Sequence, residues 1–151
     1  MAEGAVSKQP DVICSSAIGS CVVIALYETR ARIGGLAHIM LPEISRKEMR
    51  KTPFQCADTG IASLIEWMRG EGAEMKYIAA KIVGGARMFS YYQSNPNIGE
   101  RNIKCVKQVL RKKGIPLIGE DVGGSCGRSV KFHLDSGKLI IRSTGREKKV
   151  I

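Results

Sequence analysis

The hydrophobic positions divide the chain into short apolar runs and two longer amphipathic segments. The most prominent runs span 22–27 and 33–41 and flank a polar tip at 28–32, which is the pattern of two strands joined by a turn. We therefore predict an antiparallel hairpin that closes near Arg30. Further apolar runs predict strands at 12–14, 77–83, 115–119, 129–134 and 138–142.

Two segments repeat their hydrophobic residues at the period of an amphipathic helix. The first begins at Asp58 or Thr59, either of which could cap it, and ends near Arg69. The second spans 99–113, and Gly114 is a suitable stop for it. Strands outnumber helices, and two helices of this length can cover one face of a sheet. The pattern therefore predicts a layered α/β fold.

Length and composition indicate the number of domains and the cellular compartment. The chain has 151 residues, of which 44% are hydrophobic and 25% charged, as is typical of a single soluble domain. We place this domain at 11–143, between a flexible leader at 1–10 and a basic tail at 144–151. The sequence contains neither an apolar stretch near the roughly 20 residues of a membrane span nor a signal peptide. These features predict a cytoplasmic protein without membrane insertion.

The cysteines add to this picture. Five of them stand at 14, 21, 56, 105 and 126. An odd number without a C-x-x-C pair is typical of neither a disulfide framework nor a zinc site. We therefore expect reduced thiols, and the compartment that keeps them reduced also permits a working thiolate.

The formal net charge of +10 bears on partners rather than on the fold. A basic surface suits nucleic acid, an anionic membrane face or an acidic protein. Aromatic residues make up only 5% of the chain and are not interleaved with the basic runs, as a base-stacking surface would require. We expect no nucleic-acid binding, and a basic nucleic-acid-binding module remains the alternative that strongly salt-dependent binding would reveal.

The candidate chemistry lies at the open end of the predicted hairpin. Cys21 opens the first strand and His38 lies near the end of the second, so antiparallel pairing would place them side by side. A thiol beside an imidazole is the minimal constellation for a cysteine nucleophile and its base. Gly19 and Ser20 come just before the cysteine, and glycine lets a substrate approach the main chain. The alternatives are a Cys21 that only packs, and a rival nucleophile, Cys126, in a glycine-rich loop.

Around these residues the chain resembles the chemoreceptor glutamine deamidase CheD family. The match runs from about Val12 to Arg142 and rests on short segments that follow the family's order at family-like spacing. These are SSAIGSCV at 15–22, RIGGLAHIMLP at 32–42, ADT at 57–59, KIVGGARMF at 81–89, IGERN at 98–102, EDVGG at 120–124 and GR at 127–128. The resemblance implies a three-layer α/β/β sandwich with mixed sheets in a single domain.

The resemblance also implies an activity. The family converts specific glutamine side chains in the cytoplasmic domain of chemoreceptors to glutamate with loss of ammonia, in chemotaxis adaptation. It uses no metal or organic cofactor, and its regulatory partner is a CheC-type phosphatase. On this resemblance Cys21 is the nucleophile, His38 is the base, and Ser15 stands where a family threonine orients the imidazole. Gly19 and Ser20 would contact the substrate, with backbone N–H groups near them as oxyanion donors.

The sequence departs from the family pattern near the predicted site. Ser15 keeps the hydroxyl of the family threonine without its methyl group, Ala17 replaces a glycine, and Cys56 stands where tyrosine is frequent. Two alternatives stay open. One is a non-catalytic regulator that binds CheC and chemoreceptors without turnover. The other is hydrolysis of receptor glutamyl methyl esters at the same site.

Overall fold

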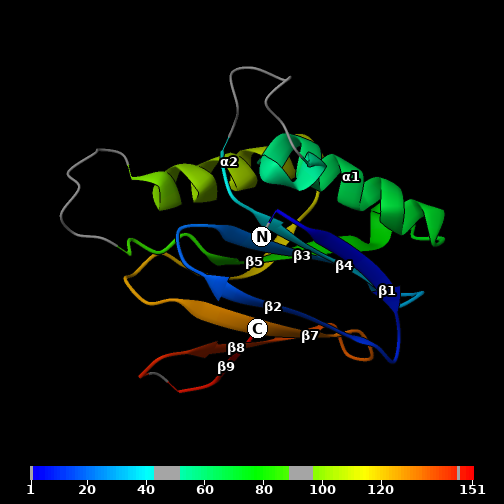
Figure 1. The fold of residues 1–151 in the computed structure, drawn as a ribbon. Helices are drawn as coiled ribbons and strands as arrows, with labels where there is room; N and C mark the ends of the chain where they lie inside the picture. Colours follow the sequence, from blue (N-terminus) through cyan, green and yellow to red (C-terminus); the bar gives the residue numbers. More distant parts are fainter. Residues whose placement is uncertain (1, 43–51, 89–96, 146) are drawn as a thin grey trace.

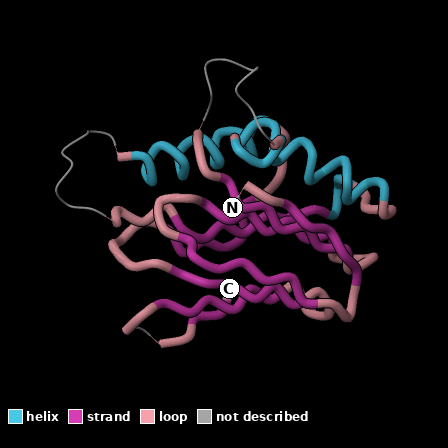
Figure 2. Tube along the Cα trace, viewed as in Figure 1, coloured by secondary structure: helices cyan, strands magenta, loops and turns pink. Residues whose placement is uncertain are grey.

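The computed structural model describes residues 2–42, 52–88, 97–145 and 147–151. Within these ranges two α-helices lie on one face of a five-stranded sheet, and a four-stranded sheet packs against its other face (Figure 1, Figure 2). We call them the larger sheet and the smaller sheet. The order of the layers confirms the predicted α/β/β sandwich.

The strand order of the larger sheet is β1-β4-β3-β5-β6. Its strands span Gly4–Lys8 (β1), Ile33–Ile39 (β4), Val22–Glu28 (β3), Ile78–Gly84 (β5) and Leu117–Val122 (β6). The first four pair antiparallel, whereas β5 and β6 pair parallel, so this sheet is mixed. The parallel pair arises because the chain crosses over the sheet through a helix between these two strands.

The smaller sheet has the order β2-β7-β8-β9, and its pairings between described residues are antiparallel. Its strands span Val12–Ile18 (β2), Arg128–His133 (β7), Lys138–Ser143 (β8) and Lys149–Val150 (β9). Its inner face packs on the larger sheet in one cluster: Ile18, Val23, Ala25, Leu36, Val83, Val130, Phe132, Leu134, Leu139 and Ile141. Its outer face is covered by neither helix (Figure 1).

The helices α1 (Ala57–Gly70) and α2 (Ile98–Lys112) confirm both predicted helices to within a residue or two at each end. Short 3-10 turns at Pro53–Gln55 and Met75–Tyr77 precede α1 and β5. The apolar stripes of both helices pack on the larger sheet and form a second core cluster with it. No helix in the described ranges is long and apolar enough to cross a membrane.

The predicted cap of α1 is wrong. The N-cap residue is Cys56, and it makes no side-chain cap hydrogen bond. Asp58 lies inside the first turn, and the Thr59 hydroxyl donates to the Pro53 carbonyl at 2.6 Å. The cap therefore lies two or three residues earlier than the polar side chains indicate, because the 3-10 turn at Pro53–Gln55 leads directly into the helix.

The chain ends also differ from the prediction. Residues 4–8 of the predicted leader form β1, which pairs with β4 from Gly4↔Ala37 to Lys8↔Ile33. Residues 149–150 of the predicted tail form β9 beside β8. Both are edge strands held by main-chain hydrogen bonds, which need no apolar periodicity in the sequence. The domain boundaries at 11 and 143 stay a prediction, and Phe89 of the family-like segments lies outside the described residues.

Candidate active site

The predicted base, His38, is buried between the two sheets. It lies on β4 directly opposite Val23 of β3, and that face of the larger sheet packs against the smaller sheet. The His38 side chain is 6% exposed, and its backbone N–H donates to the Glu3 carbonyl at 2.9 Å. Strands β3 and β1 therefore fix the main chain of His38 from both sides.

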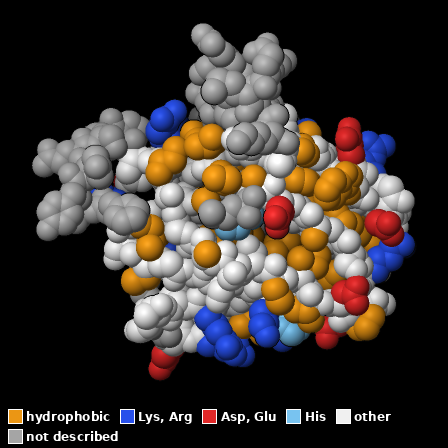
Figure 3. All heavy atoms as spheres, in the orientation of Figure 1, with side chains coloured by type: hydrophobic (Ala, Val, Ile, Leu, Met, Phe, Trp, Pro, Cys, Tyr) orange, Lys and Arg blue, Asp and Glu red, His pale blue; other side chains and the backbone are white. Residues whose placement is uncertain are grey.

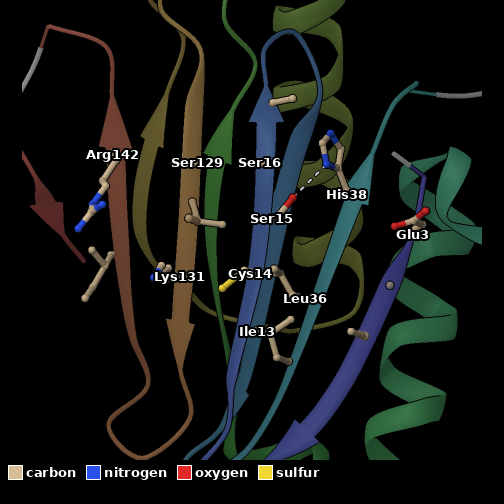
Figure 4. Close-up of a pocket in the computed structure, with 15 residues that line it drawn as sticks. Glu3, Ile13, Cys14, Ser15, Ser16, Leu36, His38, Ser129, Lys131 and Arg142 are labelled. Atoms are coloured by element: carbon tan, nitrogen blue, oxygen red, sulfur yellow. Dashed lines mark hydrogen bonds between the residues drawn. The ribbon is translucent and has the colours of Figure 1, made fainter.

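Ser15 holds the imidazole. Its Oγ lies 3.1 Å from His38 Nδ1, and Figure 4 shows the serine side chain reaching from β2 toward the ring. The other ring nitrogen, Nε2, is buried and has no hydrogen-bond partner among the described residues. A hydroxyl oxygen that accepts from Nδ1–H would leave Nε2 as the lone-pair nitrogen, which is the tautomer a general base needs.

The strand predicted at 12–14 stops before Ser15, but the structure extends it as β2, in which Ser15 pairs with Val130 of β7. The alternation of the strand points Ser15 inward toward β4. The register then shifts between Ser15 and Ile18, and Ala17 in this bulge has a φ of 54°. That left-handed conformation favours glycine, which accounts for the glycine that the resemblance places at Ala17.

Cys21 is half-buried and stands immediately before β3. It precedes Val23 by two residues, and Val23 pairs with His38. The continued register would set Cys21 diagonal to His38 on one face of the sheet, at a Cα separation of roughly 7–8 Å. This extended register makes the two residues neighbours along the sheet, and His38 Nε2 has no hydrogen-bond partner within the described residues.

The main chain of Cys21 is held by the glycine pair Gly84–Gly85 at the end of β5. The Gly85 N–H donates to the Cys21 carbonyl at 2.7 Å, and the Ala86 N–H donates to the Gly19 carbonyl at 2.8 Å. Gly84 has a φ of 118°, and a Cβ there would lie 2.3 Å from the Cys21 carbonyl oxygen. Only a residue without a Cβ permits this close approach. The glycine pair therefore fixes the direction of the peptide groups beside the thiol.

Burial sets the protonation states of the pair. It raises the pKa of the Cys21 thiol, although the cysteine's own backbone N–H favours the thiolate. It lowers the pKa of the His38 imidazole. Both shifts disfavour the charged forms. The resting pair at neutral pH is consequently a neutral thiol and a neutral imidazole rather than an ion pair.

Asn102 of α2 joins the two strand ends that carry these residues, and sequence reasoning assigned it no role. It is fully buried, and its side-chain Nδ2 donates to the carbonyls of Ser20 and Met40, both at 2.9 Å. Ser20 directly precedes Cys21, and Met40 follows His38 by two residues. The sequence feature that could have identified Asn102 is its position four residues before Val106, which places a polar side chain on the apolar stripe of α2.

The other predicted residues lie around this centre. The carbonyls of Gly19 and Ser20 serve the hydrogen bonds described above, and a Cβ at Gly19 would lie 3.0 Å from Met88 Cγ. Cys126 is half-buried, and its carbonyl accepts a hydrogen bond from Arg128. Arg128 also donates hydrogen bonds to Asp121 and to the Gly123 carbonyl. These bonds give the glycine-rich loop a fixed conformation.

A groove of about 520 Å³ leads to the Ser15–His38 pair. It crosses β2 from the smaller sheet toward β1 (Figure 4). The residues that line it are Glu3, Gly4, Ala5, Ile13, Cys14, Ser15, Ser16, Ala17, Leu36, His38, Ser129, Val130, Lys131, Ile140 and Arg142. Within the described part of the chain, no group of three or more His, Cys, Asp or Glu side chains is arranged to hold a metal ion.

Known proteins resemble this chain along its length. The family model described as "CheD chemotactic sensory transduction" matches residues 40–143. A probable chemoreceptor glutamine deamidase CheD from Caldanaerobacter subterraneus is 42% identical, over 100% of this chain and 94% of the relative. Its counterpart from Methanosarcina barkeri is 45% identical, over 97% and 96%. The chemoreceptor glutamine deamidase CheD of Thermotoga maritima is 41% identical, over 95% and 88%.

Proposed function

The chain belongs to the CheD family, and from this premise we propose that it is a chemoreceptor glutamine deamidase with Cys21 as nucleophile. The reaction hydrolyses the side-chain amide of a receptor glutamine to glutamate and ammonia. One observation carries the assignment of the site. A buried imidazole is bonded through Nδ1 to Ser15, leaves Nε2 without a partner among the described residues, and lies next to the strand that Cys21 opens.

The first half of the reaction forms a thioester. Cys21 Sγ attacks the side-chain carbonyl carbon of the glutamine while its proton passes to His38 Nε2. Because the pKa of the thiol is raised, proton transfer must accompany the attack. The tetrahedral intermediate then collapses, the C–N bond breaks, and the proton on Nε2 leaves with the nitrogen as ammonia.

The second half returns the enzyme to its resting state. A water molecule gives a proton to Nε2 and attacks the thioester carbonyl carbon. The C–S bond breaks, the thiol recovers its proton, and the glutamine side chain has become glutamate. Ser15 keeps the imidazole in one tautomer and one orientation through both halves, since its Oγ stays bonded to Nδ1.

The negative oxygen of each tetrahedral intermediate needs fixed donors. The backbone N–H of Cys21 lowers the pKa of its own thiol against the larger effect of burial, which raises it, and we take this N–H as one donor beside the reacting carbon. The peptide groups on both sides are immobilised through the carbonyls of Gly19, Ser20 and Cys21. We assign the oxyanion site to the N–H groups of Ser20 and Cys21, with Gly19 leaving room for the substrate.

The partners follow from the same family membership. The substrate is the cytoplasmic domain of a chemoreceptor, so we expect the protein to act in the cytoplasm. A CheC-type phosphatase is the regulatory partner that we propose. Neither partner requires nucleic acid or membrane insertion.

The test is ammonia release from a purified chemoreceptor cytoplasmic fragment, measured for wild type, Ser15→Ala and Ser15→Thr. The proposal predicts release by wild type, a loss of about tenfold or more in kcat for the alanine variant, and restored activity for threonine. Wild type that binds the fragment without releasing ammonia would instead identify a non-catalytic regulator. Ammonia release that is unchanged in Ser15→Ala would show that the serine has no role in the reaction.

A further inference from the structure

The outer face of the smaller sheet carries positive charge without compensating carboxylates. The residues that point outward share the uncovered side of β2, β7, β8 and β9, and they alternate with buried neighbours in β7 and β8 and with half-buried ones in β2. They are Val12, Cys14, Ser16, Ser129, Lys131, His133, Lys138, Ile140, Arg142 and Val150. None of them is acidic. We call this set the basic face.

The cations of the basic face form one cluster. Lys131 pairs laterally with Ile140, which places Lys138 and Arg142 on the two diagonals from it, at roughly 7–8 Å between Cα atoms. None of these three side chains forms an ion pair with another described residue. Some cations elsewhere do have a carboxylate partner, as in Lys8–Glu71, Lys76–Glu74 and Lys107–Glu120. The basic face thus has an unbalanced charge that its own sheet does not neutralise.

This face is continuous with the candidate active site. Lys131, Ile140 and Arg142 line the same groove that reaches Ser15 and His38. Figure 4 shows Arg142 and Lys131 on one side of β2 and the serine–histidine pair on the other. In the space-filling view, Lys and Arg side chains gather on the lower part of the face that also carries exposed hydrophobic surface (Figure 3). A protein whose glutamine enters the site would therefore lie across β2.

We propose that the basic face docks an acidic segment of the protein that carries the target glutamine. The inference rests on the proposed function for the identity of that protein. Carboxylates on the segment would supply the counter-charges that Lys131, Lys138 and Arg142 lack. Ile140 and the 49% exposed Val150 offer apolar contact between the cations. Nucleic acid fits this face less well, because its outward residues include no Phe, Tyr or Trp side chain on which bases could stack.

The experiment compares two charge reversals of equal size. Lys131→Glu with Arg142→Glu alters the basic face, whereas Lys104→Glu with Lys112→Glu alters exposed positions of α2 in the opposite layer. Steady-state deamidation of a chemoreceptor cytoplasmic fragment is measured at low and high salt. The basic-face variant should raise KM about tenfold at low salt while kcat changes less than about twofold, and it should lose most of the salt dependence. The α2 variant should keep the KM of wild type.

Binding separates this proposal from the proposed function. Each charge reversal is repeated in a Cys21→Ala background, and the Kd for the same fragment is measured by titration. If wild type releases no ammonia, the proposed function fails, yet a Kd weakened only by the basic-face variant still supports docking. Equal effects of the two charge reversals, or no effect of either, would overturn it. So would a mixed-sequence DNA duplex that binds through the basic face while the fragment does not.

Discussion

Replacing Asn102 with alanine should destabilise the protein and impair catalysis together. The side chain is fully buried and makes two hydrogen bonds of 2.9 Å to the carbonyls of Ser20 and Met40. Each bond is worth about 1 kcal/mol net, and carbonyls left without a partner add to the cost. We therefore expect a loss of roughly 2–3 kcal/mol in the free energy of unfolding, which corresponds to a fall of about 4–12 °C in Tm for a chain of this size.

The catalytic loss has a geometric cause. Asn102 ties the residue before Cys21 to the strand end beyond His38, so its removal frees the two strand ends to move relative to each other. Misplacement of a reacting group by about 1 Å can cost two orders of magnitude in rate. We expect kcat to fall about tenfold or more at a temperature where the variant is still folded.

Chemical denaturation and ammonia release provide the assay, with two companion variants. Asn102→Asp preserves the volume but replaces the donor by an acceptor that faces two carbonyl oxygens, so it should be less stable than alanine. Gln108→Ala lies at an exposed position of the same helix and should match wild type in both measurements. An alanine variant within about 0.5 kcal/mol of wild type, with unchanged kcat, would refute the role assigned to Asn102.

Three further predictions concern the backbone and the buried imidazole. Ala17→Gly should raise the free energy of unfolding by about 1 kcal/mol in urea denaturation, because Ala17 has a φ of 54°; an unchanged midpoint would contradict this. Gly84→Ala should lower Tm and abolish ammonia release, because the new Cβ would lie 2.3 Å from the Cys21 carbonyl oxygen. Gly72→Ala, which is also at positive φ but has open space around it, should lower Tm less and keep activity. Equal effects of the two substitutions would refute the role of this contact. The His38 pKa is lowered from 6.5 by burial, so its stabilising contribution is complete above pH 6.5 and is lost as the pH falls toward the folded-state pKa. The Tm of His38→Gln should therefore fall less than that of wild type when the pH is lowered from about 7.5 to 5. Parallel curves of Tm against pH for the two proteins would show that the imidazole is not buried.

The hydrophobic pattern was sufficient to predict the centre of the fold. The hairpin of 22–27 and 33–41 is present as β3 and β4, and both amphipathic segments are helices. These elements bury a continuous face, so their apolar residues must recur at the period of the backbone. The edge strands β1 and β9 escaped prediction because main-chain hydrogen bonds place them at the sheet edges, and any side chain permits such bonds.

The candidate site likewise contains some positions that local sequence predicts and others that it does not. The placement of Cys21 and His38 at matching ends of one hairpin could be predicted, because the register of a hairpin follows from local sequence. Ser15 was identified through the family resemblance, but its place in β2 depends on pairing with β7, more than a hundred residues away. Asn102 contacts Ser20 and Met40 from across a helix–sheet interface. Such contacts depend on how layers pack, and no periodicity encodes them.

The mass of a chemoreceptor fragment after incubation tests the central claim, that Cys21 and His38 carry out deamidation, most directly. Deamidation adds about one dalton for each glutamine converted by the thioester route, and peptide mapping locates it. We predict this shift with wild type and with Cys126→Ala, and none with Cys21→Ala or His38→Ala at equal folded concentration. A shift that persists in Cys21→Ala, or that disappears in Cys126→Ala, would contradict the account.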